Sequence, residues 1–129
     1  MADSLILTPQ PISLTNGLVQ ELRLAWDFSE YDVVDLGISV LSAGASAVLT
    51  LDFLTSMQSQ FDDFTWAGGS TSPLAGTVSA MQTVNKTYGA TLQTAGGYFL
   101  FKYVRWKATF TSGSAMTVMI AGQGRRKGS

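Results

Sequence analysis

Residues 33–55 decide the fold, and they read VVDLGISVLSAGASAVLTLDFLT. Apolar side chains take every second position from Val34 to Val40 and again from Ala47 to Phe53. A period of two is typical of strands with one buried face. The segment between the two runs contains glycine, which adopts the positive φ of tight turns without strain. The stretch therefore predicts a β-hairpin with strands at residues 33–41 and 47–55.

The same pattern recurs elsewhere in the chain. Residues 98–111 and 115–121 flank Ser112-Gly113-Ser114 and predict a second hairpin with the same structural role. Alternation over residues 22–28 predicts a further strand, whereas residues 54–63 could form at most a short helical turn. Short strands separated by Gly- and Ser-rich turns predict an all-β fold, an antiparallel β-sandwich of the jelly-roll-like kind.

A single sandwich domain is expected at residues 16–121, with a different kind of segment on either side. Residues 1–15 are apolar but contain Pro9 and Pro11, which exclude a central strand. They form either an edge strand or an extended arm laid across a neighbouring molecule by strand addition. Residues 122–129 are predicted to be a flexible basic tail, either a solvated terminus or an electrostatic tether.

The composition excludes several classes of chemistry. The chain has no Cys and no His, so it has no disulfide, no Cys/His zinc site, no Cys nucleophile and no His general base. Residues 1–22 contain no Lys or Arg, so the positive region of a signal peptide is missing. Charged residues make up only 13% of the chain, which favours surface that becomes buried against partners, although 14 Ser and 14 Thr also solvate a surface.

Charge is divided unequally along the sequence. Residues 1–63 hold all nine acidic residues and one base, Arg23, whereas residues 64–129 hold seven bases and no acid. Either the two halves mix within one fold, or the molecule is bipolar and docks on oppositely charged copies or on a charged lattice.

Carboxylates are the remaining candidates for catalysis. One group is found between two expected strands and another before Trp66: Asp27, Glu30, Asp32, Asp35, Asp62 and Asp63. Their spacing singles out no acid/base pair and matches no calcium loop. No phosphate-binding loop and no Gly-x-Ser-x-Gly elbow occurs. We therefore expect a protein that is not an enzyme, with no catalytic residue, no metal site and no cofactor.

The strand expected from residue 98 has two different faces. One is predicted to face the core: Leu100, Lys102, Val104, Trp106, Ala108 and Phe110. The other places aromatic residues beside bases: Phe99, Phe101, Tyr103, Arg105, Lys107 and Thr109. That second face is either covered by other parts of the fold or exposed to a protein, a sugar or a nucleic acid. An RNA-recognition motif is disfavoured because its helices are missing.

Several segments together resemble a known class of protein. They are YDVVDL at residues 31–36, AVLTL at 47–51, LTSMQ at 54–58, Trp66, YFLFKYVRWK at 98–107 and MTVMI at 116–120. Over residues 30–121 this arrangement resembles small β-sandwich virion proteins of tailed bacteriophages, of the head decoration (cement) or the neck and tail accessory type. The resemblance implies a structural role in a virus particle, in which several copies clamp capsid subunits.

The resulting expectation is a capsid decoration protein that stabilises the capsid lattice. Its expected partners are the major capsid protein or other virion proteins. It is also expected to form a homo-oligomer, most of all a trimer. Neither a membrane nor a nucleic acid is an expected partner. It would lie on the capsid surface and be soluble in the host cytoplasm before assembly. A neck or tail accessory protein, or a carbohydrate-binding module using Trp66, Phe99, Phe101 and Tyr103, is the alternative. The expected partner-binding residues are Leu5, Ile6, Leu7, Ile12, Phe99, Phe101, Tyr103, Arg105, Lys107, Arg125, Arg126 and Lys127.

Overall fold

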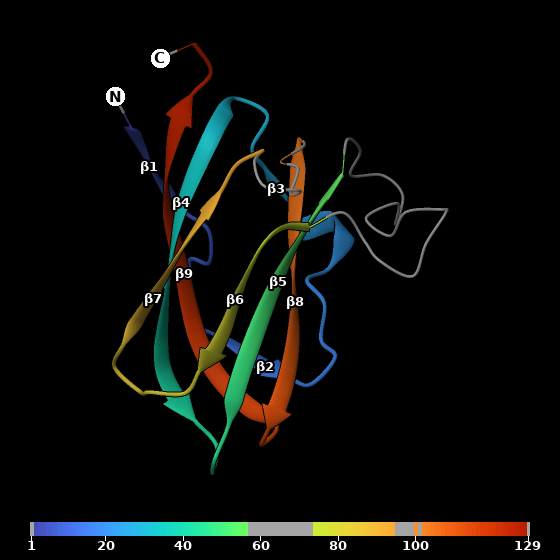
Figure 1. Ribbon diagram of the computed structural model, residues 1–129, viewed down its shortest axis with the longest axis vertical. Helices are drawn as coiled ribbons and strands as arrows, with labels where there is room; N and C mark the ends of the chain where they lie inside the picture. Colours follow the sequence, from blue (N-terminus) through green and yellow to red (C-terminus); the bar gives the residue numbers. More distant parts are fainter. Residues whose placement is uncertain (1, 57–73, 95–99, 101, 129) are drawn as a thin grey trace.

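The computed structural model describes residues 2–56, 74–94, 100 and 102–128. Within them the chain forms two antiparallel sheets that face each other, which confirms the predicted all-β sandwich (Figure 1). Sheet A has the order β1-β9-β4-β7, with β2 paired to the other half of β9. Its strands are β1 (Ala2–Ile6), β2 (Ile12–Thr15), β4 (Tyr31–Ala43), β7 (Thr87–Leu92) and β9 (Ala115–Arg126). Sheet B has the order β3-β8-β5-β6, and its strands are β3 (Trp26–Asp27), β5 (Val48–Ser56), β6 (Leu74–Met81) and β8 (Tyr103–Ser112).

The core lies between the sheets and follows the predicted alternation. The apolar residues from Val34 to Val40 and from Leu49 to Phe53 are buried and face inward. On β8 the same is true of Val104, Trp106, Ala108 and Phe110, so the expected core face of that strand is confirmed over these four residues. A period of two thus correctly assigns each side chain to the inner or the outer face of its strand.

The two predicted hairpins are wrong. β4 pairs with β7 and β9, and β5 pairs with β6 and β8, so the β4–β5 and β8–β9 loops each carry the chain from one sheet to the other. The two arches lie side by side: the Gly44 amide donates to the Ala115 carbonyl oxygen at 2.9 Å. Gly113, at φ 69°, comes so close that a Cβ there would lie 2.6 Å from Ala47 Cα. Alternation and a glycine loop are common to hairpins and arches, so the sequence pattern could not separate them.

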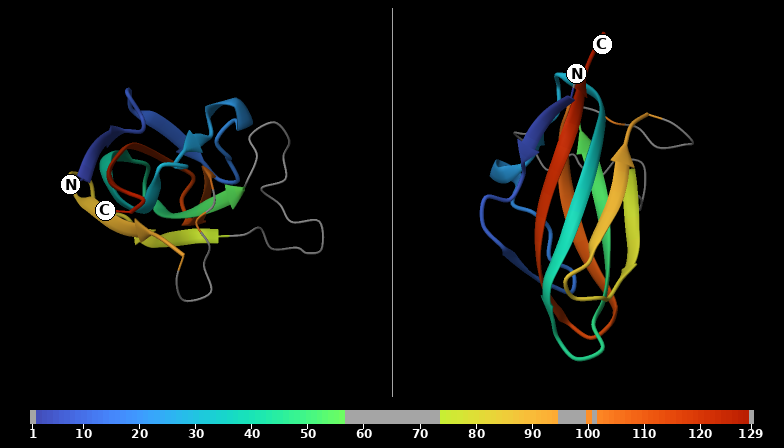
Figure 2. Two further views of the ribbon diagram at one scale, coloured as in Figure 1. Left: turned by 90° about the horizontal axis from the view of Figure 1, so that it is seen from above. Right: turned by 90° about the vertical axis from the view of Figure 1, so that its left-hand side faces the viewer.

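The N-terminal segment closes one open side of the sandwich. β1 is an edge strand of sheet A, with Ala2 opposite Arg125 and Ile6 opposite Ala121. After β2 the chain crosses to sheet B, where the Gly17 amide donates to the Ala108 carbonyl oxygen at 2.9 Å. Figure 2 shows this segment running along the side of the two sheets.

The predicted strand over residues 22–28 is also wrong for most of its length. Leu22–Leu24 form a 3-10 turn, η1, and only the short β3 follows it. The Gln20 side-chain amide donates to the Leu24 carbonyl oxygen at 2.8 Å, so this carbonyl of the turn has a local partner. The Leu24 side chain is half exposed. Trp26 and Phe28 do face the core, so only the last part of the alternation marks a buried face.

The predicted flexible tail from residue 122 is contradicted by β9, which continues to Arg126. Tyr31 explains why glycine interrupts this strand: a Cβ on Gly124 would lie 2.5 Å from Tyr31 Cδ1. Gly124 therefore makes room for the Tyr31 ring. Both chain ends lie at the same end of the sandwich, opposite the two arches (Figure 1).

Candidate partner-binding groove

The predicted partner-binding residues of the N-terminal segment do not share one environment. Leu5, Leu7 and Ile12 are half-buried and pack against the core, so they support the chain's own fold. Ile6 points the other way, onto the outward face of sheet A, and is 80% exposed. Of these four residues, Ile6 is therefore the one most available to a partner.

The expected surface on β8 is only partly accessible. Phe99 and Phe101 lie outside the described residues. Arg105 is 7% exposed and its Nε donates to the Gln20 carbonyl oxygen at 2.9 Å, so its prediction as a partner-binding residue is contradicted by its burial. Tyr103 is half-buried, and Lys107 is exposed opposite Asp52 of β5. The alternation of side chains along the strand assigns Arg105 to the outer face. It does not indicate that residues 18–21 lie beside Arg105.

The basic residues near the C-terminus are found next to acids from the first half of the chain. Arg126 Nε lies 2.8 Å from Asp3 Oδ2, and its Nη1 lies 3.6 Å from Glu30 Oε2. Tyr31 also donates to Asp3, and partial desolvation together with this bond raises the pKa of its phenol. The amide of Lys127 donates to the Glu30 carbonyl oxygen at 3.0 Å. Opposite charges of the two halves therefore meet within one fold at this end.

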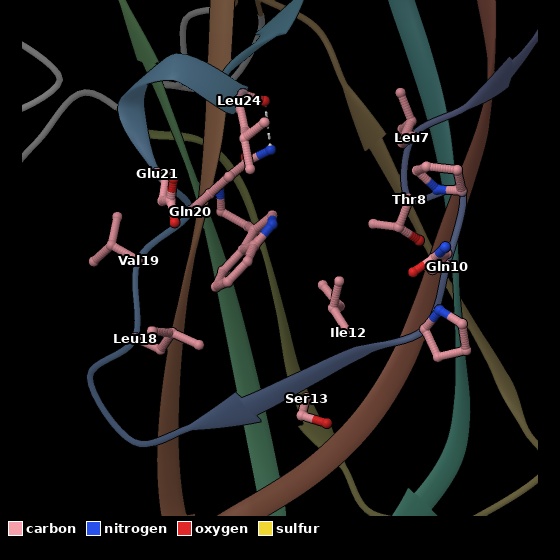
Figure 3. Close-up of a pocket in the computed structure, with 13 residues that line it drawn as sticks. Leu7, Thr8, Gln10, Ile12, Ser13, Leu18, Val19, Gln20, Glu21 and Leu24 are labelled. Atoms are coloured by element: carbon pink, nitrogen blue, oxygen red, sulfur yellow. Dashed lines mark hydrogen bonds between the residues drawn. The ribbon is translucent and has the colours of Figure 1, made fainter.

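A groove opens on the side of the sandwich that the N-terminal segment closes. We call it the Trp106 groove, and its volume is about 530 Å³. One wall is the connection between β1 and β2, the other is the segment from Leu18 to Leu24, and Trp106 contributes to the lining between them. Figure 3 shows Leu7, Thr8 and Ile12 facing Gln20 and Leu24 across this space.

Local sequence explains the first wall. Pro9 and Pro11 remove two backbone donors, so the chain leaves the sheet between β1 and β2. Thr8 anchors the departure point, because its Oγ1 accepts from the Ile120 amide at 2.8 Å and its own amide donates to the Ile120 carbonyl oxygen. The bulging connection therefore stands away from β9 at a fixed place and forms a wall.

Gln20 fixes the second wall against β8. Its amide donates to the Trp106 carbonyl oxygen at 3.0 Å, and its Oε1 accepts from the Trp106 amide at 3.2 Å. With Nε2 bonded to Leu24, each polar end of the Gln20 side chain has a partner. The rim beside it is apolar, since Leu18 is 39% and Leu24 50% exposed.

The charge of the Trp106 groove is low. Among its described lining residues Glu21 is the only charged one, and its carboxylate pairs with Arg23 Nε at 2.8 Å. An exposed apolar groove without unpaired charge fits an apolar side chain of a partner. The arrangement offers binding by burial of apolar surface.

Two of the carboxylates considered for catalysis, Asp27 and Asp35, accept hydrogen bonds from neighbouring residues. Hydrogen bonds from the Ser29 side chain and backbone hold the pKa of Asp27 below its ordinary value. Asp35 accepts from Thr91 Oγ1 at 2.7 Å. Asp62, Asp63 and Trp66 lie outside the described residues. Within the described ranges no cluster of three or more acidic residues could hold a metal ion.

Comparison with known protein families, with curated proteins and with solved structures finds no match for this chain. Over the described parts of the chain, no helix has the length and apolar character needed to cross a bilayer.

The Trp106 groove was missed by the sequence reasoning, although its parts were visible. Leu7 and Ile12 were proposed as contacts, but Leu18, Leu24 and Trp106 were assigned to no site. The available signal was the Pro9/Pro11 pair between two apolar runs, which indicates a bulging connection. Nothing in the sequence indicated that residues 18–24 would face that connection.

Proposed function

We propose that the chain is a non-enzymatic structural protein of a virus particle, most specifically a capsid decoration protein that binds and stabilises the capsid lattice. The observation that carries this proposal is the Trp106 groove, an apolar recess with exposed Leu18 and Leu24 on its rim. The sequence resemblance to phage sandwich proteins supports the same assignment. A capsid subunit would insert an apolar side chain of an extended segment into the groove.

The energetics of such binding suit a protein present in many copies. Burying one Leu-sized side chain stabilises a complex by about 1.5–3 kcal/mol. A single contact of this size is weak, but contacts repeated over a lattice add through avidity. A ligand that binds only the assembled lattice stabilises it by about 2.7 kcal/mol at 100 times its Kd. The decoration protein would therefore act without any chemical step.

Co-sedimentation of the purified protein with cognate capsids tests this function. We expect Leu18→Asp to weaken capsid binding at least tenfold, because a charge at the rim opposes burial in an apolar contact. Val84→Asp is the matched control, since Val84 is equally exposed at 40% but lies in the turn between β6 and β7. Melting temperatures of both variants establish that they are folded.

Two outcomes would count against the proposal in different ways. If the wild-type protein does not bind capsids, and capsids lacking it are equally stable, the decoration function is lost. If Leu18→Asp binds as tightly as the wild type, the function stands but the Trp106 groove is not the contact. Electron microscopy of labelled particles separates the head from the neck and tail, where the alternative accessory role would place the protein.

The carbohydrate-binding alternative gains no support from the described residues. Tyr103 is half-buried, with Lys102 Nζ 5.3 Å from its ring centroid. Trp66, Phe99 and Phe101, which that alternative also used, lie outside the described residues.

A further inference from the structure

Short hydroxyl side chains cover part of the outward face of sheet A. Its hydroxyl groups bond to neighbours across the strands: Ser39 with Thr87 at 2.9 Å, Thr91 with Asp35 at 2.7 Å and Ser13 with Thr117 at 3.4 Å. Gly37 of β4 and Ala121 of β9 lie on the same face and are paired with each other. Because these groups are short and already partnered, a second flat surface could approach closely, as the two sheets of a sandwich do at about 10 Å.

Larger apolar side chains also point out from this face. Ile6 is 80% exposed at the β1 edge, although isoleucine is among the residues most often buried. Leu41, 40% exposed, lies on the same face where β4 bulges between Val40 and Ser42. Met119 of β9, half-buried, also points outward. The face therefore carries apolar side chains whose burial would be favourable.

A hollow lies next to Ile6. It is lined by residues 4–6 of β1, residues 35–37 of β4 and residues 121–123 of β9. Ala121 stands opposite Ile6 on one side and opposite Gly37 on the other. The small residues at these two positions leave space into which a branched aliphatic side chain fits. The protruding Ile6 side chain and the hollow that could accept such a side chain thus lie next to each other on the same face.

This face carries both an acidic and a basic side chain, so two copies of it can be complementary in charge. Asp35 of β4 and Arg125 of β9 are both exposed and both point outward. When two identical faces meet about a two-fold axis, each acid of one copy can approach a base of the other. The extent of the face is sufficient: at about 16 Å² for each residue of a sheet, β9 and β4 with their shorter neighbours span about 600 Å². A standard interface buries about 800 Å² per partner, so the two values are comparable.

The geometry points to a second copy of this chain as the occupant: two molecules pack their sheet A faces against each other, with Ile6 of each inserted beside Ala121 and Gly37 of the other. The contact is isologous, so it closes at two copies and does not propagate into a fibre. It lies on a different surface from the Trp106 groove. Self-association therefore goes beyond the proposed capsid function and is independent of it.

Sedimentation equilibrium of the full chain tests this pairing. We expect the wild type to be a dimer at about 100 μM, and Ile6→Asp to raise the dimer Kd at least tenfold. Ala121→Arg, which fills the hollow from an exposed position, is expected to have the same effect. Val84→Asp is the control and is expected to remain dimeric. Equal melting profiles at low concentration show that the variants are folded.

Two results would overturn the inference. The wild type could be monomeric at this concentration, or both face variants could remain dimeric. If the wild type is monomeric and Ile6→Asp also loses capsid binding, the face belongs to a contact with a capsid subunit. Failure of the capsid function is distinguishable, since it is read from co-sedimentation with Leu18→Asp, a residue that lies outside the sheet A face.

Discussion

Gly124 faces inward on β9 and lies directly against the ring of Tyr31. We expect Gly124→Ala to destabilise the protein by about 1–3 kcal/mol, because its Cβ would overlap the ring and force it to shift. Gly89→Ala is the matched control, since a Cβ there would lie 3.8 Å from its nearest neighbour, the Leu36 carbonyl oxygen. Urea unfolding measures the free energy of unfolding of both variants. Equal stabilities would show that the ring moves aside freely.

Tyr88 is a second residue whose surroundings set a measurable property. Its phenol oxygen accepts from the backbone amides of Gln82 and Thr83 at 3.2 and 3.1 Å, and these bonds, helped by Lys86, lower the pKa of Tyr88 to about 8. A lowered folded-state pKa adds stability above the unfolded value of 10.0, and this contribution is lost as pH falls through about 8. We expect the melting temperature of the wild type, relative to Tyr88→Phe, to rise between these pH values. If the difference in melting temperature between the wild type and Tyr88→Phe stays constant over this pH range, the expectation is contradicted.

At the scale of elements, β1 decides whether the N-terminal segment belongs to the domain. Removing residues 1–11 deletes the pairing of β1 with β9 and the packing of Leu5 and Leu7 against the core. We expect a loss of at least about 3 kcal/mol, which is a large part of the stability of a small domain. Chemical unfolding measures the loss, and removal of Gly128 and Ser129 serves as the control. A truncated chain of full stability would show instead that the segment is an arm.

The elements also show what the sequence could and could not predict. Val34–Val40 and Leu49–Phe53 were predicted correctly because side-chain alternation is a local property of a strand. The neighbours of these strands were not, since pairing of β4 with β9 depends on residues far apart in the chain. The candidate site was predicted in part for the same reason. Leu7 and Ile12 stood out locally, whereas the Trp106 groove needs two distant segments to meet.

For the whole molecule, the intermixing of the two charged halves has a consequence for assembly. Asp3 and Glu30 already pair with Arg126 inside one molecule, so these charges are partly neutralised before any second copy binds. Exposed ion pairs contribute about 0–1 kcal/mol each. We expect dimer formation to weaken less than about tenfold when salt rises from about 0.1 M to 1 M, where the Debye length falls to about 3 Å. A steep loss of association, measured by sedimentation, would favour charge-driven docking of the two halves.

The two arches that join opposite sheets also govern how the chain reaches its folded state. Because β4 must pair with β9 and β5 with β8, each sheet joins segments that are remote in the sequence. Such non-local pairing has a high entropic barrier, and all-β domains of this kind fold in milliseconds to seconds. On the ribosome, β9 emerges after every other described strand, and it is an inner strand of sheet A. Sheet A therefore stays incomplete throughout most of synthesis. The edge of β4 that hydrogen-bonds to β9 has no partner strand until β9 has been synthesised.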